Sequence, residues 1–115
     1  MIIFLYGADT YRSKQKLKEI VARYKTLHQS GLNLWHYDFS EKKEFLIRDL
    51  REKIESVSMF QEKKLIILER FFEMTDNETQ KQVLDYFSQK NIFKDDNVIV
   101  LIWEEIIAQK NPLAP

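Results

Sequence analysis

Three short runs of consecutive apolar residues constrain the fold of this chain more than any other feature. They occupy residues 2–6, 65–68 and 98–103. An apolar run without polar residues at alternate positions is typical of a β-strand that is covered on both faces. We therefore expect three such strands.

A fourth strand is predicted over residues 32–39, where large side chains fall on alternate faces of an extended backbone. The two sets are Leu32, Leu34 and His36 on one face, and Trp35, Tyr37 and Phe39 on the other.

Between the strands, apolar residues recur every three or four positions, which predicts three amphipathic helices. Residues suited to cap a helix precede each pattern: Asp9 or Thr10, then Ser40, then Asp76 or Asn77. The expected buried stripes are Leu17, Ile20, Val21, Tyr24 and Leu27 in the first helix, Leu46, Leu50, Ile54 and Val57 in the second, and Val83, Leu84 and Phe87 in the third.

Strands and helices thus alternate along the chain. Right-handed crossovers then give a parallel sheet with helices on both faces. We predict one α/β domain of three layers over residues 1–105, followed by a short polar tail at 106–115.

Composition excludes several classes of function. Eighteen basic residues balance 18 acidic ones, so net charge gives no argument for bulk nucleic-acid binding. The absence of cysteine excludes disulfides and thiolate zinc sites, and it fits a reducing cytoplasm. The apolar start, MIIFLYG, is far shorter than a membrane span, so we expect no membrane association.

The first strand is followed by YGADTYRSK, at the place where a nucleotide-binding P-loop would lie. A P-loop needs a second glycine and then Lys-Ser/Thr, because its backbone N–H groups and the lysine hold the phosphates. Counting from Gly7, Arg12 takes the place of the second glycine and Ser13 that of the lysine, while Lys14 comes one residue late. We predict a degenerate site that does not bind ATP.

Other candidate groups give weaker signals. The third strand ends in Glu69-Arg70 rather than in an acid pair, which predicts a solvated ion pair. Glu104 and Glu105 are likewise expected to be solvated, and we predict no metal site and no cofactor. A receiver domain would need an acidic cluster that the first strand lacks. His28 and His36 are expected to be a surface and a packed histidine.

The first helix is rich in basic residues. They would suit phosphate or an acidic partner, but a solvated outer face is the simpler interpretation. The residues are Arg12, Lys14, Lys16, Lys18, Arg23 and Lys25.

The stretch ESVSMFQEKKLIIL is unusual, because Met59 and Phe60 stand together between a polar helix end and a charged segment. Taken with the P-loop-shaped start that lacks its lysine and the third strand that lacks its acid pair, this stretch resembles the delta subunit of bacterial DNA polymerase III. The resemblance covers Ile2 to about Glu105 and matches the amino-terminal domain of that family.

The resemblance implies an AAA+-type, P-loop-like fold that has lost nucleotide binding. It also implies a non-catalytic subunit of the polymerase holoenzyme, a nucleotidyltransferase, acting in DNA replication. In the family, a helical lid and a helical collar follow this domain, and the tail at 106–115 would begin the lid. Contacts with other clamp-loader subunits are implied only where lid and collar exist, and contact with DNA only indirectly.

The resemblance further implies that a small or polar residue followed by an apolar pair enters a pocket on the sliding clamp, the beta subunit. The matching positions are Ser58, Met59 and Phe60, with Val57 as a supporting contact. The alternative for the pair is that it folds back onto the core of the domain. Two other functions stay open: a divergent P-loop NTPase or nucleotide kinase, and a stand-alone protein-interaction module.

Overall fold

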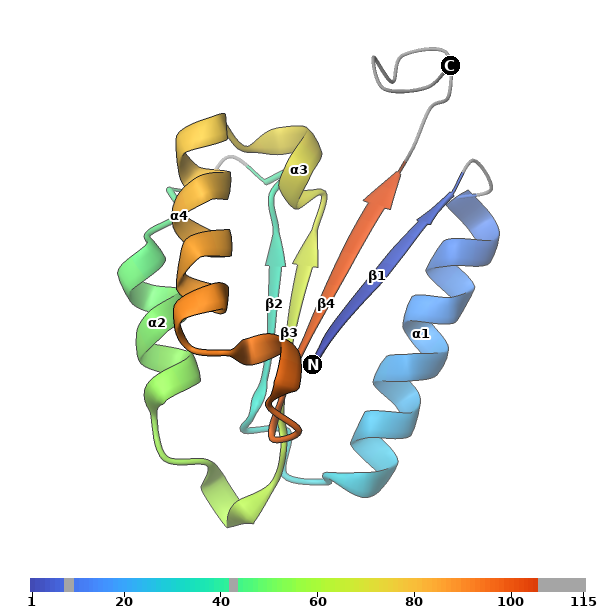
Figure 1. Ribbon diagram of the computed structural model, residues 1–115. Coiled ribbons are helices and arrows are strands. Elements are labelled where there is room, and N and C mark those ends of the chain that lie inside the picture. The colour runs from blue at the N-terminus through green and yellow to red at the C-terminus, as the bar shows by residue number, and fades with distance from the viewer. Residues whose placement is uncertain (8–9, 42–43, 106–115) are drawn as a thin grey trace.

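The computed structural model describes residues 1–7, 10–41 and 44–105. Within them, four parallel strands form one sheet in the order β1-β4-β3-β2 (Figure 1). All three pairings, β1 with β4, β4 with β3 and β3 with β2, are parallel, as predicted. The strands are β1 (Ile2–Gly7), β2 (Leu34–Asp38), β3 (Lys64–Glu69) and β4 (Val98–Glu105).

Helices cover both faces of the sheet, which confirms the predicted three layers. One layer is α1, and the other contains α2 and α4, with the short α3 joining β3 to α4 (Figure 1). The bounds are α1 (Thr10–Leu27), α2 (Ile47–Glu55), α3 (Phe71–Met74) and α4 (Asn77–Gln89), with 3-10 turns η1 (Met59–Gln61) and η2 (Ile92–Lys94). No helix in the described ranges is long and apolar enough to cross a membrane.

Two apolar cores lie on opposite faces of β3 and β4. Under α1, Leu17 and Tyr24 pack with Leu65 and Ile67 of β3. On the other face, Leu50 of α2 and the apolar residues of α4 pack with Ile66 and Leu68 of β3 and with Val100 and Ile102 of β4. Residues 65–68 are buried throughout, because β3 is an inner strand with helices above and below. The apolar run at 65–68 is therefore covered on both faces, as predicted.

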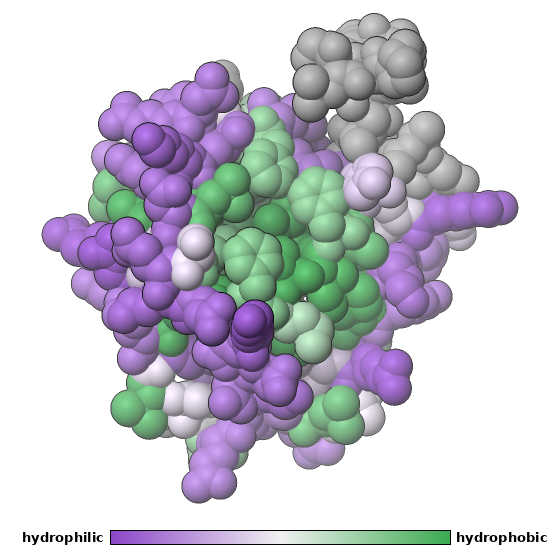
Figure 2. Space-filling view, in the orientation of Figure 1, coloured by the Kyte–Doolittle hydropathy of each residue, from purple (hydrophilic) through white to green (hydrophobic). Residues whose placement is uncertain are grey.

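β1 departs from the prediction that it is covered on both faces. Phe4 and Tyr6 are exposed, while Ile3 and Leu5 on the opposite face pack toward α1. β1 is an edge strand of the described sheet, and α2 and α4 pack over the other strands. Figure 2 shows apolar surface gathered over β1 and β4 beside α4.

The ends of the helices differ from the sequence predictions in several places. Asp76 caps α4 as predicted, accepting a hydrogen bond from the backbone N–H of Thr79 at 2.7 Å. Ser40 does not cap α2, because its hydroxyl and N–H both donate to Asp38 and the helix begins only at Ile47. Asp9 lies outside the described residues.

Three residues assigned to buried stripes are exposed instead: Leu27, Leu46 and Val57. Leu27 is the last residue of α1, whereas Leu46 and Val57 lie outside the bounds of α2. At the end of an element, helical periodicity no longer directs a side chain toward the sheet. Leu32 is also exposed, because it lies in a turn and β2 starts at Leu34.

Candidate functional site

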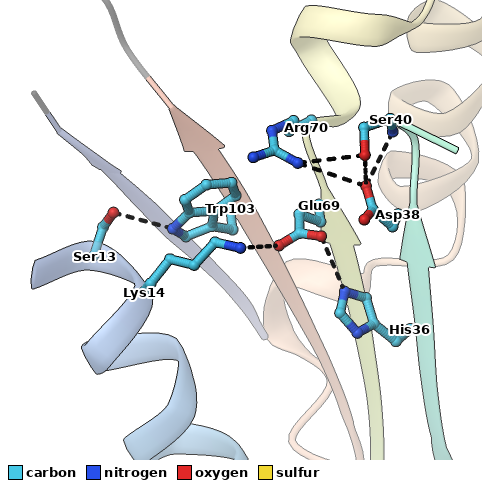
Figure 3. Close-up of polar contacts among 8 residues, drawn as sticks. All are labelled: Ser13, Lys14, His36, Asp38, Ser40, Glu69, Arg70 and Trp103. Carbon is cyan, nitrogen blue, oxygen red and sulfur yellow. Dashed lines mark hydrogen bonds and ion pairs between the residues drawn. The ribbon is translucent and has the colours of Figure 1, made fainter. Parts of the chain in front are cut away.

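The parallel strands bring their carboxyl ends to one edge of the sheet, where ligands commonly bind in open α/β folds. Side chains from α1, β2, β3 and β4 meet there (Figure 3). They are Ser13, Lys14, His36, Asp38, Ser40, Glu69, Arg70 and Trp103.

Two of the four degenerate P-loop positions, Ser13 and Lys14, lie in this group. Gly7 ends β1, Arg12 is exposed on α1, and Ser13 stands where a P-loop would have its lysine. The Ser13 Oγ accepts a hydrogen bond of 3.1 Å from Nε1 of the buried Trp103. Ser13 is thus engaged with an aromatic side chain of the protein itself.

Lys14 is paired within the protein (Figure 3). Its Nζ lies 3.4 Å from Oε1 of Glu69 and 5.0 Å from the centroid of the Trp103 ring. The other Glu69 oxygen lies 3.6 Å from Nε2 of His36. An ammonium beside a carboxylate is already neutralised, so Lys14 is poorly placed to hold phosphate.

Glu69 therefore differs from the prediction of a solvated pair with Arg70. The residue is only 4% exposed. The reason is its place at the end of an inner strand, where neighbouring elements supply its partners. His36, predicted to be packed, is exposed on β2 and makes the second contact with this carboxylate.

Arg70 turns toward β2 instead of toward Glu69. Its Nη1 lies 3.9 Å from Oδ1 of Asp38 and donates to the Ser40 hydroxyl at 3.3 Å. Burial acts to raise the pKa of the Asp38 carboxyl, but hydrogen bonds from Ser40 and the positive charge of Arg70 lower it to about 2. Asp38 is thus ionised at neutral pH.

Glu104 also departs from the prediction that it is solvated. It is buried, and its carboxylate accepts hydrogen bonds of 3.1 Å from the backbone N–H groups of both Phe72 and Glu73. Burial raises the pKa of Glu104, although these hydrogen bonds act to lower it. The Glu104 carboxylate therefore satisfies two backbone N–H groups of the short helix α3. Among the described residues, no cluster of three His, Cys, Asp or Glu side chains is arranged to hold a metal ion.

The basic face of α1 is mostly solvent-exposed, as the simpler interpretation predicts. Arg12, Lys16, Lys18, Arg23 and Lys25 are all exposed. Lys14 is the exception, because it turns toward Glu69.

The other candidate lies at the opposite edge of the sheet, in the α2–β3 loop, defined here as residues 56–63 (Figure 1). Val57 is 89% exposed and Phe60 is 72% exposed. Ser58 is half-buried and donates from its Oγ to the backbone carbonyl of Glu62. The side chain of Met59 lies outside the described part of the chain, although its backbone begins η1.

The loop has an unusual backbone. Phe60 and Gln61 both have positive φ, at 57° and 56°. Non-glycine residues rarely adopt this left-handed conformation, because Cβ then crowds the backbone. Two in succession mark a segment whose surroundings fix its shape, and such segments gather at functional sites.

Sequence reasoning missed the polar groups that hold this loop. Glu62 reaches back to Ser30 and Asn33 in the connection before β2. Lys64, the first residue of β3, is buried against the end of α2. The charged segment EKK before the apolar run at 65–68 was the available signal, since charges adjoining a buried strand need partners.

Together, these observations define a parallel three-layer α/β domain with its carboxyl edge closed by internal ion pairs and an exposed apolar loop at the opposite edge. The family model described as DNA polymerase III, delta subunit, matches residues 3–113. The chain therefore belongs to the DNA polymerase III delta subunit family, an accessory subunit family of DNA replication. No curated protein and no solved structure matches it.

Proposed function

We propose that this chain is the clamp-binding domain of a delta-type clamp-loader subunit and acts in the cytoplasm. Val57, Ser58, Met59 and Phe60 dock into an apolar pocket of the sliding clamp, the beta subunit. The proposal rests on the family match and on the loop geometry. Other loader subunits would join only if lid and collar domains accompany this domain, and DNA would be contacted only indirectly.

The exposure of Phe60 carries the proposal. Phe60 is 72% exposed. By contrast Phe71, two residues after the end of β3, is completely buried. The domain thus has an interior that accommodates phenylalanine, yet it holds Phe60 in solvent. This exposure argues against the alternative in which Phe60 folds back onto the core. Large aromatic side chains displayed in this way are the usual anchors of protein interfaces.

Clamp opening would follow from differential binding. A loop that fits the clamp better when its ring interface is open shifts the equilibrium toward the open ring. No bond is made or broken, so this chain needs no ATP hydrolysis of its own. The internal pairing of Lys14 with Glu69 supports a domain that works without nucleotide.

The test is a titration of the sliding clamp from the same organism with the 115-residue chain and its Met59→Ala/Phe60→Ala variant. Full burial of each side chain contributes about 1.5–3 kcal/mol. We therefore expect clamp affinity to fall by at least about a hundredfold, since each factor of ten corresponds to about 1.4 kcal/mol. We expect the melting temperature of the free domain to change little, because Phe60 is exposed and truncating an exposed side chain seldom shifts stability by more than about 0.5 kcal/mol.

A matched control is Met74→Ala/Phe93→Ala, which removes the same two side-chain types outside the loop, at positions that are 50% and 59% exposed. This control should leave clamp affinity unchanged. A Met59→Ala/Phe60→Ala variant that melts much earlier but binds the clamp normally would contradict the proposal. Micromolar affinity of the chain for Mg-ATP would instead favour the NTPase alternative.

A further inference from the structure

Lys64 is a buried cation at the base of the α2–β3 loop. The residue is 4% exposed, and its Nζ donates to the backbone carbonyls of Lys53 at 2.8 Å, Ile54 at 2.7 Å and Ser56. Burial lowers the pKa of this ammonium, an effect that the negative charge of Asp95 partly opposes. Lys53 and Ile54 lie in the last turn of α2, and Ser56 is the residue that follows it.

The last carbonyls of a helix have no partner within the helix, and a lysine ammonium can satisfy them. It also interacts favourably with the negative end of the helix dipole. Removing an ammonium from water is unfavourable unless it is fully hydrogen-bonded, so Nζ is held firmly at this position. Lys64 therefore ties the last turn of α2 and Ser56 to the first residue of β3.

The far end of the loop is fixed by a second set of contacts. The Glu62 carboxylate accepts from the Ser30 hydroxyl, from the Ser30 N–H at 3.3 Å and from the Asn33 side-chain amide at 3.2 Å. The Tyr24 hydroxyl donates to the Lys63 carbonyl. Burial and the Glu62 charge raise the pKa of Tyr24 to about 12, so the phenol remains a donor at neutral pH.

Between these anchors the backbone adopts the two consecutive left-handed residues, Phe60 and Gln61. Each such conformation is unfavourable for a residue with a Cβ. It persists only where the surroundings over-determine it, and here Lys64 fixes the span that the loop must close.

We propose that Lys64 is a positioning residue for clamp binding: by capping α2 it sets the ends of the α2–β3 loop and pre-organises Val57 and Phe60 for the clamp. The inference rests on the proposed function of the loop. Pre-organisation strengthens binding, because the partner does not have to order the segment.

The experiment measures clamp affinity by calorimetric titration for the 115-residue chain, for its Lys64→Met variant and for a synthetic peptide of residues 55–63. Methionine keeps most of the buried volume but removes every donor. We expect the chain to bind at least about tenfold more tightly than the peptide, and Lys64→Met to lose about tenfold of affinity, approaching the peptide. Lys81→Met is the control, since Lys81 is an exposed lysine of α4 outside the loop, and the affinity of this variant should be unchanged.

A coupling measurement separates positioning from general stability. If Lys64 acts by placing Phe60, then Lys64→Met should cost much less affinity in a Phe60→Ala background than in the original chain. A folded Lys64→Met variant that binds the clamp as tightly as the original chain would overturn the proposal. So would equal losses from Lys64→Met in both backgrounds.

If Lys64→Met does not fold, the unmodified chain still decides the question. Equal clamp affinities of chain and peptide, or amide exchange over residues 57–61 as fast in the chain as in the peptide, would overturn the proposal. If Phe60→Ala loses clamp binding but Lys64→Met does not, only the proposed role of Lys64 is wrong. An unchanged affinity on Phe60→Ala defeats the function of the loop itself.

Discussion

The two edges of the sheet differ in whether their side chains are paired and buried within the protein or exposed to solvent. At the carboxyl edge, charged groups such as Lys14 and Glu69 are paired with one another, and the aromatic rings of Trp103 and Phe71 are buried. At the opposite edge, buried polar groups including Lys64 support a loop that leaves Val57 and Phe60 in solvent. The charged groups at the carboxyl edge already pair with one another and are poorly placed to bind a ligand. The apolar side chains of the loop are stabilised by burial only when a partner covers them.

The sharpest way to break this comparison is to truncate the same residue type at both edges. Phe71 is fully buried and packs on Phe39 and Phe72 at ring-centroid distances of 5.3 Å and 5.0 Å. Phe71→Ala should lower the free energy of unfolding by about 3–5 kcal/mol, because it opens a cavity in the core. Phe60→Ala should lower it by less than about 0.5 kcal/mol. Urea denaturation of both variants measures the difference, and equal losses would mean that Phe60 is packed after all.

A smaller effect is expected at Asp38, with a defined pH dependence. At neutral pH, Asp38→Asn should cost about 1–2 kcal/mol, since hydrogen bonds to a charged group are weakened. The pKa of Asp38 is about 2 in the folded protein against 3.8 for the ordinary group, so the ionised form stabilises the fold. That stabilisation is fully present above pH 4 and disappears as pH falls from about 4 to about 2.

The measurement is thermal unfolding of both proteins across this pH range. Curves for the original chain and Asp38→Asn should converge as pH falls toward about 2. A difference that persists unchanged down to that pH would show that the carboxylate charge is not the cause.

The smallest effect is expected at Glu69. Glu69→Gln removes the charge that pairs with Lys14 and His36, but both partners are more than 40% exposed at their side chains and can turn to water. The loss in the free energy of unfolding should stay below about 1 kcal/mol and should shrink further in 1 M NaCl. A salt-independent loss of several kcal/mol would instead mean that the carboxylate is an essential part of the core.

Much of the fold was accessible from sequence pattern. The uninterrupted run at 65–68 predicted a strand covered on both faces, and β3 is one, because helices from both neighbouring crossovers pack on it. The run at 2–6 has the same pattern, yet Phe4 and Tyr6 of β1 are exposed. An apolar run indicates only that burial of the strand is favourable. Which strand lies at an edge depends on the strand order, and that order is set by contacts between residues distant in sequence.

The candidate sites divide in the same way. The missing P-loop lysine and the apolar pair before β3 are local signals, readable from neighbouring residues. For Glu69, Glu104 and Lys64 the local sequence shows a charge beside an apolar run but not its partners, which lie on other elements. A charged residue beside a strand looks solvated in a sequence, and its desolvation becomes visible only when the elements that surround it are assembled.

By itself, then, the sequence determined the alternation of strands and helices, the parallel sheet and the loss of the lysine at Ser13, since each depends on spacing along the chain. The tertiary structure alone decided that Lys14 turns to Glu69, that β1 lies at an edge and that Lys64 caps α2 beneath an exposed Phe60. These features depend on which elements meet in space. The free energy of a buried charge or an exposed ring is set by those neighbours and not by the residues adjacent in the chain.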